Sequence, residues 1–214
     1  MEADFWHQRW ERGEIGFHEG RANHFLVKHV EKLNLDKGAR IFLPLCGKTR
    51  DISWLLSQGY RVVGIELSAL AINELFSELG VQPEIVNTGD LAHYRAENID
   101  IFVGDLFKLT TQMLGAVNAI YDRAALVALP EDVRPTYTSH LVGLTDTAPQ
   151  LLISFEYDQA VMPGPPFSVI GDEIQQLYAD TYHVNSIENK KVEGNLKGVV
   201  EAEEFVWLLQ PTSD

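Results

Sequence analysis

Gly47 and Glu66 have the residue types and the spacing of a site that binds the ribose of a nucleotide. Glu66 lies 19 positions after Gly47. In parallel α/β units, an acidic residue about 20 positions past a glycine turn accepts hydrogen bonds from the ribose hydroxyl groups. The pair therefore predicts that an adenosine-containing cofactor lies between the turn at residues 45–47 and Glu66. Spacing alone leaves a second interpretation open, in which Glu66 only caps a helix or faces solvent.

The pattern around these two residues predicts a strand, a turn, a helix and a second strand. An apolar run over residues 41–45 leads into the glycine turn. A helical pattern follows over residues 48–58, and a run rich in β-branched residues over 60–65 ends on Glu66. Two parallel strands need a crossover connection, which a helix of this length supplies. The sequence therefore predicts a βαβ unit with an acid at the tip of its second strand.

The turn itself distinguishes between classes of cofactor. A dinucleotide-binding turn reads G-x-G-x-x-G, and a Walker A loop needs a glycine at position 42. This turn has one glycine and one proline, and position 42 is Phe42. A turn of this kind suits a nucleoside ligand such as S-adenosylmethionine (AdoMet). The alternatives are an NAD(P)-dependent oxidoreductase on a related sheet, which the single glycine disfavours, and a non-catalytic nucleotide-binding protein.

Further candidate residues follow two later strands. Asp105-Leu106 closes a predicted strand over residues 99–104, and Arg123 follows the next predicted strand. Asp105 could face the adenine amino group with Leu106 beneath the ring, or it caps the next turn. Arg123 lies where ligands bind in open α/β sheets, or it pairs with Asp122 or Asp105.

The N-terminal residues carry an aromatic pair. Residues 4–12 have an amphipathic helical pattern, in which Trp6 and Trp10 stand four positions apart on one face. One interpretation is that the indole rings anchor the N-terminus on the core. The other is a lid whose ring faces attract the cationic sulfonium of AdoMet. We predict that residues 1–24 form such a lid segment.

Composition narrows the class of protein. The chain has 214 residues, which predicts a single domain over residues 1–214, and its net charge of −14 argues against nucleic acid and anionic membranes as partners. No apolar run approaches the ~20 residues of a membrane span, and the N-terminus lacks the pattern of a secretory signal. One cysteine fits a reducing cytoplasm.

The seven histidines form no H-x-x-x-H pair, so we expect no metal site. We expect a cytoplasmic monomer that acts on a small molecule.

The order of predicted elements gives a fold class. Five strands alternate with helices, the fifth of them at residues 150–157. Two last strands, at residues 182–188 and 198–209, have a connection too short for a helical crossover and so form an antiparallel hairpin. This layout is α/β: a Rossmann-like three-layer sandwich around a seven-stranded, mainly parallel sheet, as in class I AdoMet-dependent methyltransferases. A shared layout alone does not fix function.

Several motifs together make a family recognisable. They are FLPLCGK (42–48), VVGIELS (62–68), IYDRAALVAL (120–129), PGPPF (163–167), the N-terminal W-x-x-x-W and Gly-Phe-His (16–18). With these motifs the chain resembles thiopurine S-methyltransferase, in particular its bacterial branch, from about Phe5 to the last strand. The resemblance implies AdoMet as cofactor and methyl transfer to the sulfur of aromatic or heterocyclic thiols such as thiopurines. It also implies small selenium or tellurium compounds as further substrates.

The resemblance also assigns roles to matching positions. It implies no firmly assigned catalytic base. Arg123 is implied to bind the cofactor and, because it lies beside the substrate as well, to act as an electrostatic helper. The implied cofactor contacts are Trp10 covering the cofactor, Leu45 at the methionine part, Glu66 on the ribose, and Asp105 and Leu106 at the adenine, and the implied substrate contact is Phe17. One departure concerns the segment before the final strand, where mammalian members offer an arginine to the substrate. Residues 189–197 contain no arginine, and the candidate replacements are Lys190, Lys191 and Lys197.

Overall fold

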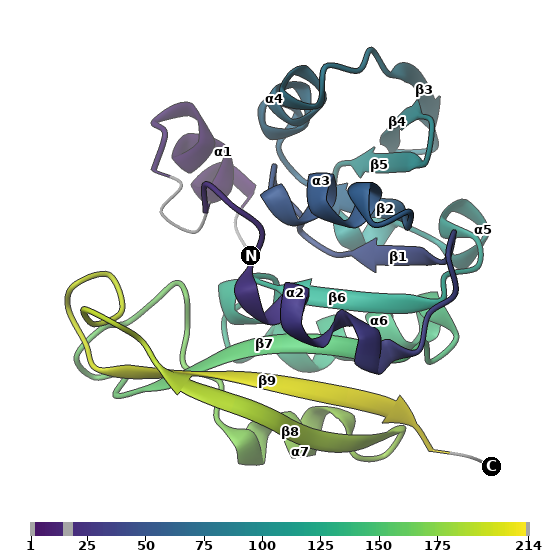
Figure 1. Ribbon diagram of the computed structural model, residues 1–214. Coiled ribbons are helices and arrows are strands. Elements are labelled where there is room, and N and C mark those ends of the chain that lie inside the picture. Colours follow the sequence, from purple (N-terminus) through teal and green to yellow (C-terminus); the bar gives the residue numbers. More distant parts are fainter. Residues whose placement is uncertain (1–2, 15–18, 213–214) are drawn as a thin grey trace. The chain divides into compact units, whose positions relative to one another are not determined.

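The computed structural model describes residues 3–14 and 19–212 (Figure 1). The chain separates into two compact units, residues 2–119 and residues 120–214. Each unit is described by itself below. None of the helices within the described residues is long and apolar enough to cross a membrane.

The first unit contains five strands in the order β3-β4-β5-β2-β1. β1, β2 and β5 run parallel, with Phe42 paired to Val63 and Gly64 paired to Ile101. β3 and β4 form a hairpin whose second strand pairs antiparallel with β5. The bounds are β1 (Arg40–Leu43), β2 (Arg61–Glu66), β3 (Glu84–Thr88), β4 (Leu91–Ala96) and β5 (Ile99–Val103). The parallel strands are apolar along nearly their whole length, as strands covered on both faces must be.

Helices precede and connect these strands, and side chains at their ends define them. The Thr49 hydroxyl accepts the backbone N–H of Asp51 and caps α3, while Ser68 accepts the N–H of Ala71 and caps α4. Gly80 ends α4 with φ 68°. A serine just before a helical pattern and a glycine just after it are the sequence signals for the start and the end of a helix, and both are confirmed here. The bounds are α1 (Ala3–Glu11), α2 (His24–His29), η1 (Val30–Leu33), α3 (Arg50–Ser57), α4 (Ala69–Leu79), η2 (Leu106–Lys108) and α5 (Thr111–Leu114).

The turn after β1 packs directly on β2, and Gly64 permits this close approach. A Cβ atom at Gly64 would lie 2.9 Å from Cys46 Sγ and 2.9 Å from Ile101 Cδ1. It would also lie 3.3 Å from the backbone oxygen of Leu43. These contacts are closer than packed carbon atoms tolerate, so only glycine lets the turn sit against the middle of the sheet.

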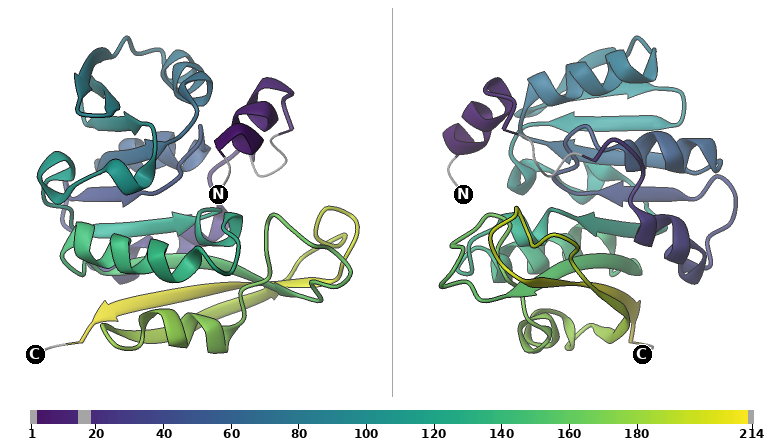
Figure 2. Two further views of the ribbon diagram at one scale, coloured as in Figure 1. Left: turned by 180° about the vertical axis from the view of Figure 1, so that it is seen from behind. Right: turned by 60° about the vertical axis from the view of Figure 1, so that its left-hand side comes forward.

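The second unit contains four strands in the order β6-β7-β9-β8. β6 and β7 are parallel, and β9 pairs antiparallel with both β7 and β8. In the left view of Figure 2, the helices α6 and α7 lie in front of these strands on one face. The bounds are β6 (Ala119–Arg123), η3 (Leu126–Ala128), α6 (Arg134–Thr145), β7 (Gln150–Tyr157), α7 (Gly171–Tyr178), β8 (Tyr182–Lys191) and β9 (Ala202–Pro211).

The α/β class and the C-terminal antiparallel hairpin predicted from the sequence are confirmed. The number of strands differs, because the described residues hold nine strands where the sequence predicted seven. The two additional strands are β3 and β4, in residues 81–99, where the polar and irregular sequence indicated only short strands around Ile85 and Val86. Most of β3 is exposed, so it shows no clear alternation of apolar and polar residues. Asp4 begins the helical pattern of residues 4–12 and is therefore an N-cap candidate from the sequence, but it lies within the first turn of α1.

Candidate active site

The turn between β1 and α3 has a fixed and unusual backbone. Leu45 has φ 46° and Gly47 has φ 52°, both in the left-handed region. The N–H of Cys46 donates to the carbonyl of Ile65 at 3.0 Å, which ties the turn to β2. A left-handed non-glycine residue costs of order 1–3 kcal/mol and persists only where its surroundings hold it. Such strain is common at ligand-binding turns, and Leu45 is the residue implied to contact the methionine part of AdoMet.

Glu66 at the tip of β2 joins this turn to the start of α4. Its Oε2 accepts the N–H of Gly47 at 2.9 Å, and its Oε1 accepts the N–H of Ser68 at 2.9 Å. The side chain is buried. Burial raises the pKa of the Glu66 carboxyl. The hydrogen bonds from the N–H groups of Ser68 and Gly47 act in the opposite direction, as do the nearby backbone N–H of Leu67 and His7 of α1. The structure therefore brings Gly47 and Glu66 into direct contact.

The carboxylate of Glu66 retains the capacity to bind a diol. Each carboxylate oxygen has two lone-pair directions, and each of the two backbone contacts uses one of them. The remaining acceptor capacity matches two adjacent hydroxyl groups, which each offer one donor. Glu66 can therefore hold the N–H groups of Gly47 and Ser68 and still accept hydrogen bonds from ribose hydroxyl groups.

The tip of β5 lies next to the tip of β2. The N–H of Gly104 donates to the carbonyl of Glu66 at 2.9 Å. Asp105 is exposed, and its Oδ1 accepts the N–H of Phe107 at 3.0 Å, which caps η2 as the alternative interpretation predicted. Leu106 is buried. Asp105 and Leu106 therefore stand beside Glu66 along the carboxyl ends of the strands, where α/β sheets bind nucleotides.

The N-terminal helix contributes a buried indole ring. Trp10 on α1 is 6% exposed, whereas Phe5 on the same helix is 41% exposed. α1 is thus anchored through Trp10, and His7 on this helix acts to lower the pKa of Glu66. Phe17, the implied substrate contact, lies outside the described residues.

In the second unit, a buried carboxylate fixes the turn that follows Arg123. Asp122 is fully buried; its Oδ2 accepts the phenol of Tyr137 at 2.6 Å and its Oδ1 accepts the N–H of Leu126 at 3.0 Å. Ala124 takes φ 62°, a left-handed conformation that these contacts hold in place. Burial raises the pKa of Asp122 to about 6, although the hydrogen bonds from Tyr137 and the backbone lower it. The backbone around the half-buried Arg123 is therefore rigidly placed.

This raised pKa predicts how stability changes with pH. The folded chain holds the Asp122 proton more tightly than the unfolded chain does, so the free energy of unfolding should fall as pH rises from about 4 to about 6. A rise in pKa from 3.8 to about 6 corresponds to about 3 kcal/mol. Asp122→Asn removes this contribution, so its stability relative to the parent should increase by up to that amount between pH 4 and pH 7. Urea unfolding at a series of pH values measures it.

A second variant sharpens this test. Tyr137→Phe removes a hydrogen bond that lowers the pKa of Asp122, so the fall in stability should extend to higher pH. A difference between Asp122→Asn and the parent that does not change with pH would contradict the assignment of Asp122 as the titrating group.

The proline-rich segment at residues 163–167 is fixed to the rest of the second unit. Its consecutive prolines alone predict a stiff loop. The phenol of Tyr157 donates to the carbonyl of Pro166 at 2.5 Å, and the N–H of Phe167 donates to the carbonyl of Val127 at 2.6 Å. Lys197 Nζ donates to the carbonyl of Pro165 at 2.6 Å. Of the three lysines considered as replacements for an arginine, Lys197 thus reaches this segment. The other two, Lys190 and Lys191, form ion pairs with nearby glutamates at 3.1 and 3.2 Å.

Sequence reasoning missed one contact that supports the cofactor turn. The N–H of Asn23 donates to Asp51 Oδ1 at 2.6 Å, and both side chains are buried. Asn23 also caps α2 through its own side chain. An asparagine directly before a helical pattern is a capping signal, but nothing in the sequence shows that Asp51 is its partner. This contact ties the end of the N-terminal segment to the first turn of α3.

Solved structures share this fold. A 1,6-didemethyltoxoflavin-N1-methyltransferase from Burkholderia thailandensis, with 1,6-didemethyltoxoflavin and S-adenosylhomocysteine bound, matches with a TM-score of 0.66 at 15% identity, covering 97% of this chain and 87% of that chain. A SAM-dependent methyltransferase from Anabaena variabilis matches with a TM-score of 0.66 at 14% identity, covering 98% and 95%. At these identities the likeness shows the fold alone.

The fold and the comparisons of sequence together define an AdoMet-dependent methyltransferase, with AdoMet as the methyl donor. The family model for thiopurine S-methyltransferase (TPMT) matches residues 1–212. A thiopurine S-methyltransferase of Xanthobacter autotrophicus is 58% identical over 211 residues, covering 98% of this chain and 99% of that protein. Another, of Gluconobacter oxydans, is 47% identical over 209 residues, covering 98% and 95%. The chain belongs to the thiopurine S-methyltransferase family. An oxidoreductase or a non-catalytic nucleotide-binding protein finds no support in these comparisons.

Proposed function

We propose that this enzyme transfers the methyl group of AdoMet to the sulfur of aromatic or heterocyclic thiols such as thiopurines. The observation that carries the proposal is the near-complete match to bacterial proteins named thiopurine S-methyltransferase, at up to 58% identity. The geometry at Glu66 supports it, because a buried carboxylate with spare acceptor capacity stands beside a strained turn.

We assign the following roles within this proposal. Glu66 accepts hydrogen bonds from the ribose hydroxyl groups, and Leu45 contacts the methionine part of AdoMet. Asp105 and Leu106 border the adenine, and Trp10 covers the cofactor. Phe17 and Arg123 face the substrate. Burial of Trp10 and Leu106 supports an apolar surface for the rings, and the position of Glu66 in the backbone network supports a preformed ribose contact.

Methyl transfer to sulfur is an in-line displacement. A lone pair of the substrate sulfur forms the new S–CH₃ bond, the bond between methyl and sulfonium breaks, and its electrons return to the sulfonium to give S-adenosylhomocysteine. The reacting species is the thiolate, and alkyl thiols ionise near pH ~8.5. Heteroaromatic thiols are more acidic because the ring delocalises the charge, so the thiol proton passes to solvent without a dedicated protein base.

Positioning contributes more to this reaction than charge does. The cation of Arg123 would favour the thiolate by about 4 kcal/mol at ~4 Å and an effective dielectric of ~20. The reaction joins a cation and an anion, however, so charge disappears in the transition state. Excess stabilisation of the thiolate would therefore raise the barrier. Holding the reacting atoms roughly 3–3.5 Å apart in a dry pocket is the larger contribution.

The organisation of the chain also belongs to this proposal. Residues 1–214 act as a single methyltransferase domain, and residues 1–24 act as a lid over the cofactor. The match of one family model to residues 1–212 supports the first point, and the electrostatic effect of His7 of α1 on Glu66 supports the second. The enzyme works as a monomer in the cytoplasm, where the single buried thiol of Cys46 stays reduced.

A transfer assay tests the proposed reaction. The full chain is incubated with AdoMet carrying a labelled methyl group and a panel of aromatic thiols, with selenols and small tellurium compounds as a second panel. We expect label in the S-methyl products of the aromatic thiols. AdoMet binding without transfer to any member of either panel would contradict the proposal and favour a binding function. Energy transfer from bound NADH would favour an oxidoreductase.

A further inference from the structure

A polar hollow of about 530 Å³ lies in the first unit, at the edge of the parallel strands opposite to Glu66. It opens at the amino ends of β2 and β5 and beside the β3–β4 hairpin. Its size falls within the range of small-molecule sites. The residues that line it are Arg61, Glu84, Arg95, Ala96, Asn98 and Asp100. None of them belongs to the site proposed for AdoMet.

Strand register places like charges side by side at this hollow. Arg40 on β1 is paired with Arg61 on β2, and residues paired between neighbouring strands point to the same face of the sheet. Like charges placed directly opposite each other on neighbouring strands are destabilising. Burial lowers the pKa of Arg40, the charge of Arg61 lowers it further, and Asp100 acts in the opposite direction. The fold therefore holds Arg61 next to another cation, although Arg61 itself is exposed.

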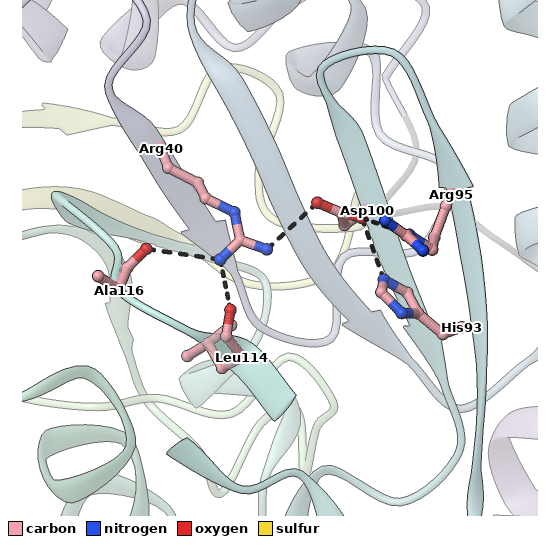
Figure 3. A network of polar contacts seen from close by, with 6 residues as sticks. All are labelled: Arg40, His93, Arg95, Asp100, Leu114 and Ala116. Carbon is pink, nitrogen blue, oxygen red and sulfur yellow. Dashed lines mark hydrogen bonds and ion pairs between the residues drawn. The ribbon is translucent and has the colours of Figure 1, made fainter. Parts of the chain in front are cut away.

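The acid at this edge, Asp100, already contacts two arginines and a histidine. Figure 3 shows Asp100 between Arg40, His93 and Arg95. Asp100 Oδ2 lies 3.2 Å from Arg40 Nη2, and Asp100 Oδ1 lies 3.1 Å from His93 Nε2 and 3.8 Å from Arg95 Nε. Arg40 is also held by the carbonyls of Leu114 and Ala116. The charge of Asp100 is thus compensated from within the fold, and it offers little repulsion to an anion nearby.

Two guanidinium groups remain directed toward solvent at the hollow. Arg61 is exposed, and the side chain of Arg95 is 53% exposed with only a 3.8 Å contact to Asp100. Guanidinium groups bind phosphate and carboxylate groups through paired hydrogen bonds. Glu84 is paired with Arg95 in the antiparallel register and offers acceptors, while Asn98 offers both a donor and an acceptor.

We propose that this hollow binds a small organic anion, with a phosphate or carboxylate group between Arg61 and Arg95 and hydroxyl or amino groups donating to Glu84 and Asn98. In a chain with a net charge of −14, two exposed arginines that line one hollow are a local exception. The bound anion would relieve the repulsion between Arg40 and Arg61. This site is separate from the site proposed for methyl transfer. A negative result in the anion-binding experiment would therefore leave the proposed reaction unaffected.

Backbone NMR of the full chain, saturated with S-adenosylhomocysteine to occupy the cofactor site, tests this inference. Ribose 5-phosphate probes for a phosphate ester and citrate probes for a carboxylate, each added to about 10 mM, tenfold above a millimolar Kd. We expect saturable shifts of the amides of Arg61 and residues 95–98 with at least one probe. Sodium chloride at matched ionic strength should not reproduce them, because screening is not site-specific.

Variants connect any binding to the two arginines. Arg61→Gln and Arg95→Gln should each weaken binding by about tenfold, the loss of one charge-assisted contact. Lys32→Gln removes one charge from an exposed side chain elsewhere in the same unit and should leave affinity unchanged. Saturation by one probe alone identifies the kind of anion. No saturable shift with either probe, or equal weakening in all three variants, would overturn the proposal.

Discussion

Replacing Glu66 by alanine is expected to weaken AdoMet binding by about a hundredfold or more. In the proposed complex the carboxylate accepts hydrogen bonds from both ribose hydroxyl groups. Hydrogen bonds to a charged group contribute about 1.5–3 kcal/mol each, and 1.4 kcal/mol corresponds to a tenfold change in affinity. Two such bonds account for the expected loss. Calorimetry with AdoMet and with S-adenosylhomocysteine should give the same loss for both ligands, because they share the ribose.

The same side chain also supports the fold, so the test needs a control. Glu66→Ala leaves the N–H groups of Gly47 and Ser68 without their carboxylate, at a cost of about 1–3 kcal/mol for each buried donor. Ser68→Ala removes the cap of α4, which typically costs ~1 kcal/mol, but leaves the carboxylate in place. We therefore expect Ser68→Ala to lower the melting temperature while AdoMet affinity stays within a few-fold of the parent.

Two outcomes would count against the ribose assignment. One is calorimetric affinity in Glu66→Ala equal to that of the parent. The other is an equal loss of affinity in Ser68→Ala, which would mean that disturbance of the α4 terminus, and not loss of the acceptor, weakens binding. Glu66→Gln gives an intermediate case, because it keeps one acceptor oxygen and replaces the other with a donor.

The sequence predicted the βαβ unit well because its signals are local. The apolar runs and the single glycine turn lie within one short stretch, and each acts on its immediate neighbours. The spacing between Gly47 and Glu66 became a 2.9 Å hydrogen bond, since two parallel neighbouring strands bring their carboxyl ends together. Ser68 and Gly80 likewise define α4 through contacts with adjacent residues.

Contacts between distant residues were not predictable in this way. Tyr137 and Asp122 come from different elements, and their 2.6 Å hydrogen bond depends on how α6 packs on β6. The like-charged pair Arg40 and Arg61 follows from strand register, which the sequence does not state. The β3–β4 hairpin was indicated only as short strands around Ile85 and Val86, for another reason. Its outer strand Glu84–Thr88 is mostly exposed, so no buried face imposed an alternating pattern.

Asp105 illustrates a third case, in which the sequence supported two roles. The structure gives it the capping role, through a 3.0 Å contact with the N–H of Phe107. Its place next to the tip of β2 keeps the adenine contact as a proposal, because Gly104 is hydrogen-bonded to the carbonyl of Glu66. A side chain that caps a turn at a strand end also has a fixed position, and a fixed position is what recognition of a ligand requires.

Arg123→Ala is expected to lower turnover by about tenfold to a hundredfold while weakening AdoMet binding by less. The full attraction of about 4 kcal/mol at ~4 Å is an upper figure, because Arg123 is half-buried and solvent screens part of its charge. Arg123→Lys retains the charge without the fork of the guanidinium, and should recover part of the lost turnover.

A series of aromatic thiols with different pKa values separates the role of charge from that of binding. If Arg123 favours the thiolate, the loss in Arg123→Ala should be largest for the thiol with the highest pKa and smallest for a thiol already ionised at the assay pH. The rate is measured at saturating AdoMet, so that cofactor affinity does not enter. A loss that is the same for every thiol would assign Arg123 to positioning. Equal losses in turnover and in AdoMet affinity would assign it to cofactor binding, because a group that acts only on the substrate leaves the free energy of cofactor binding unchanged.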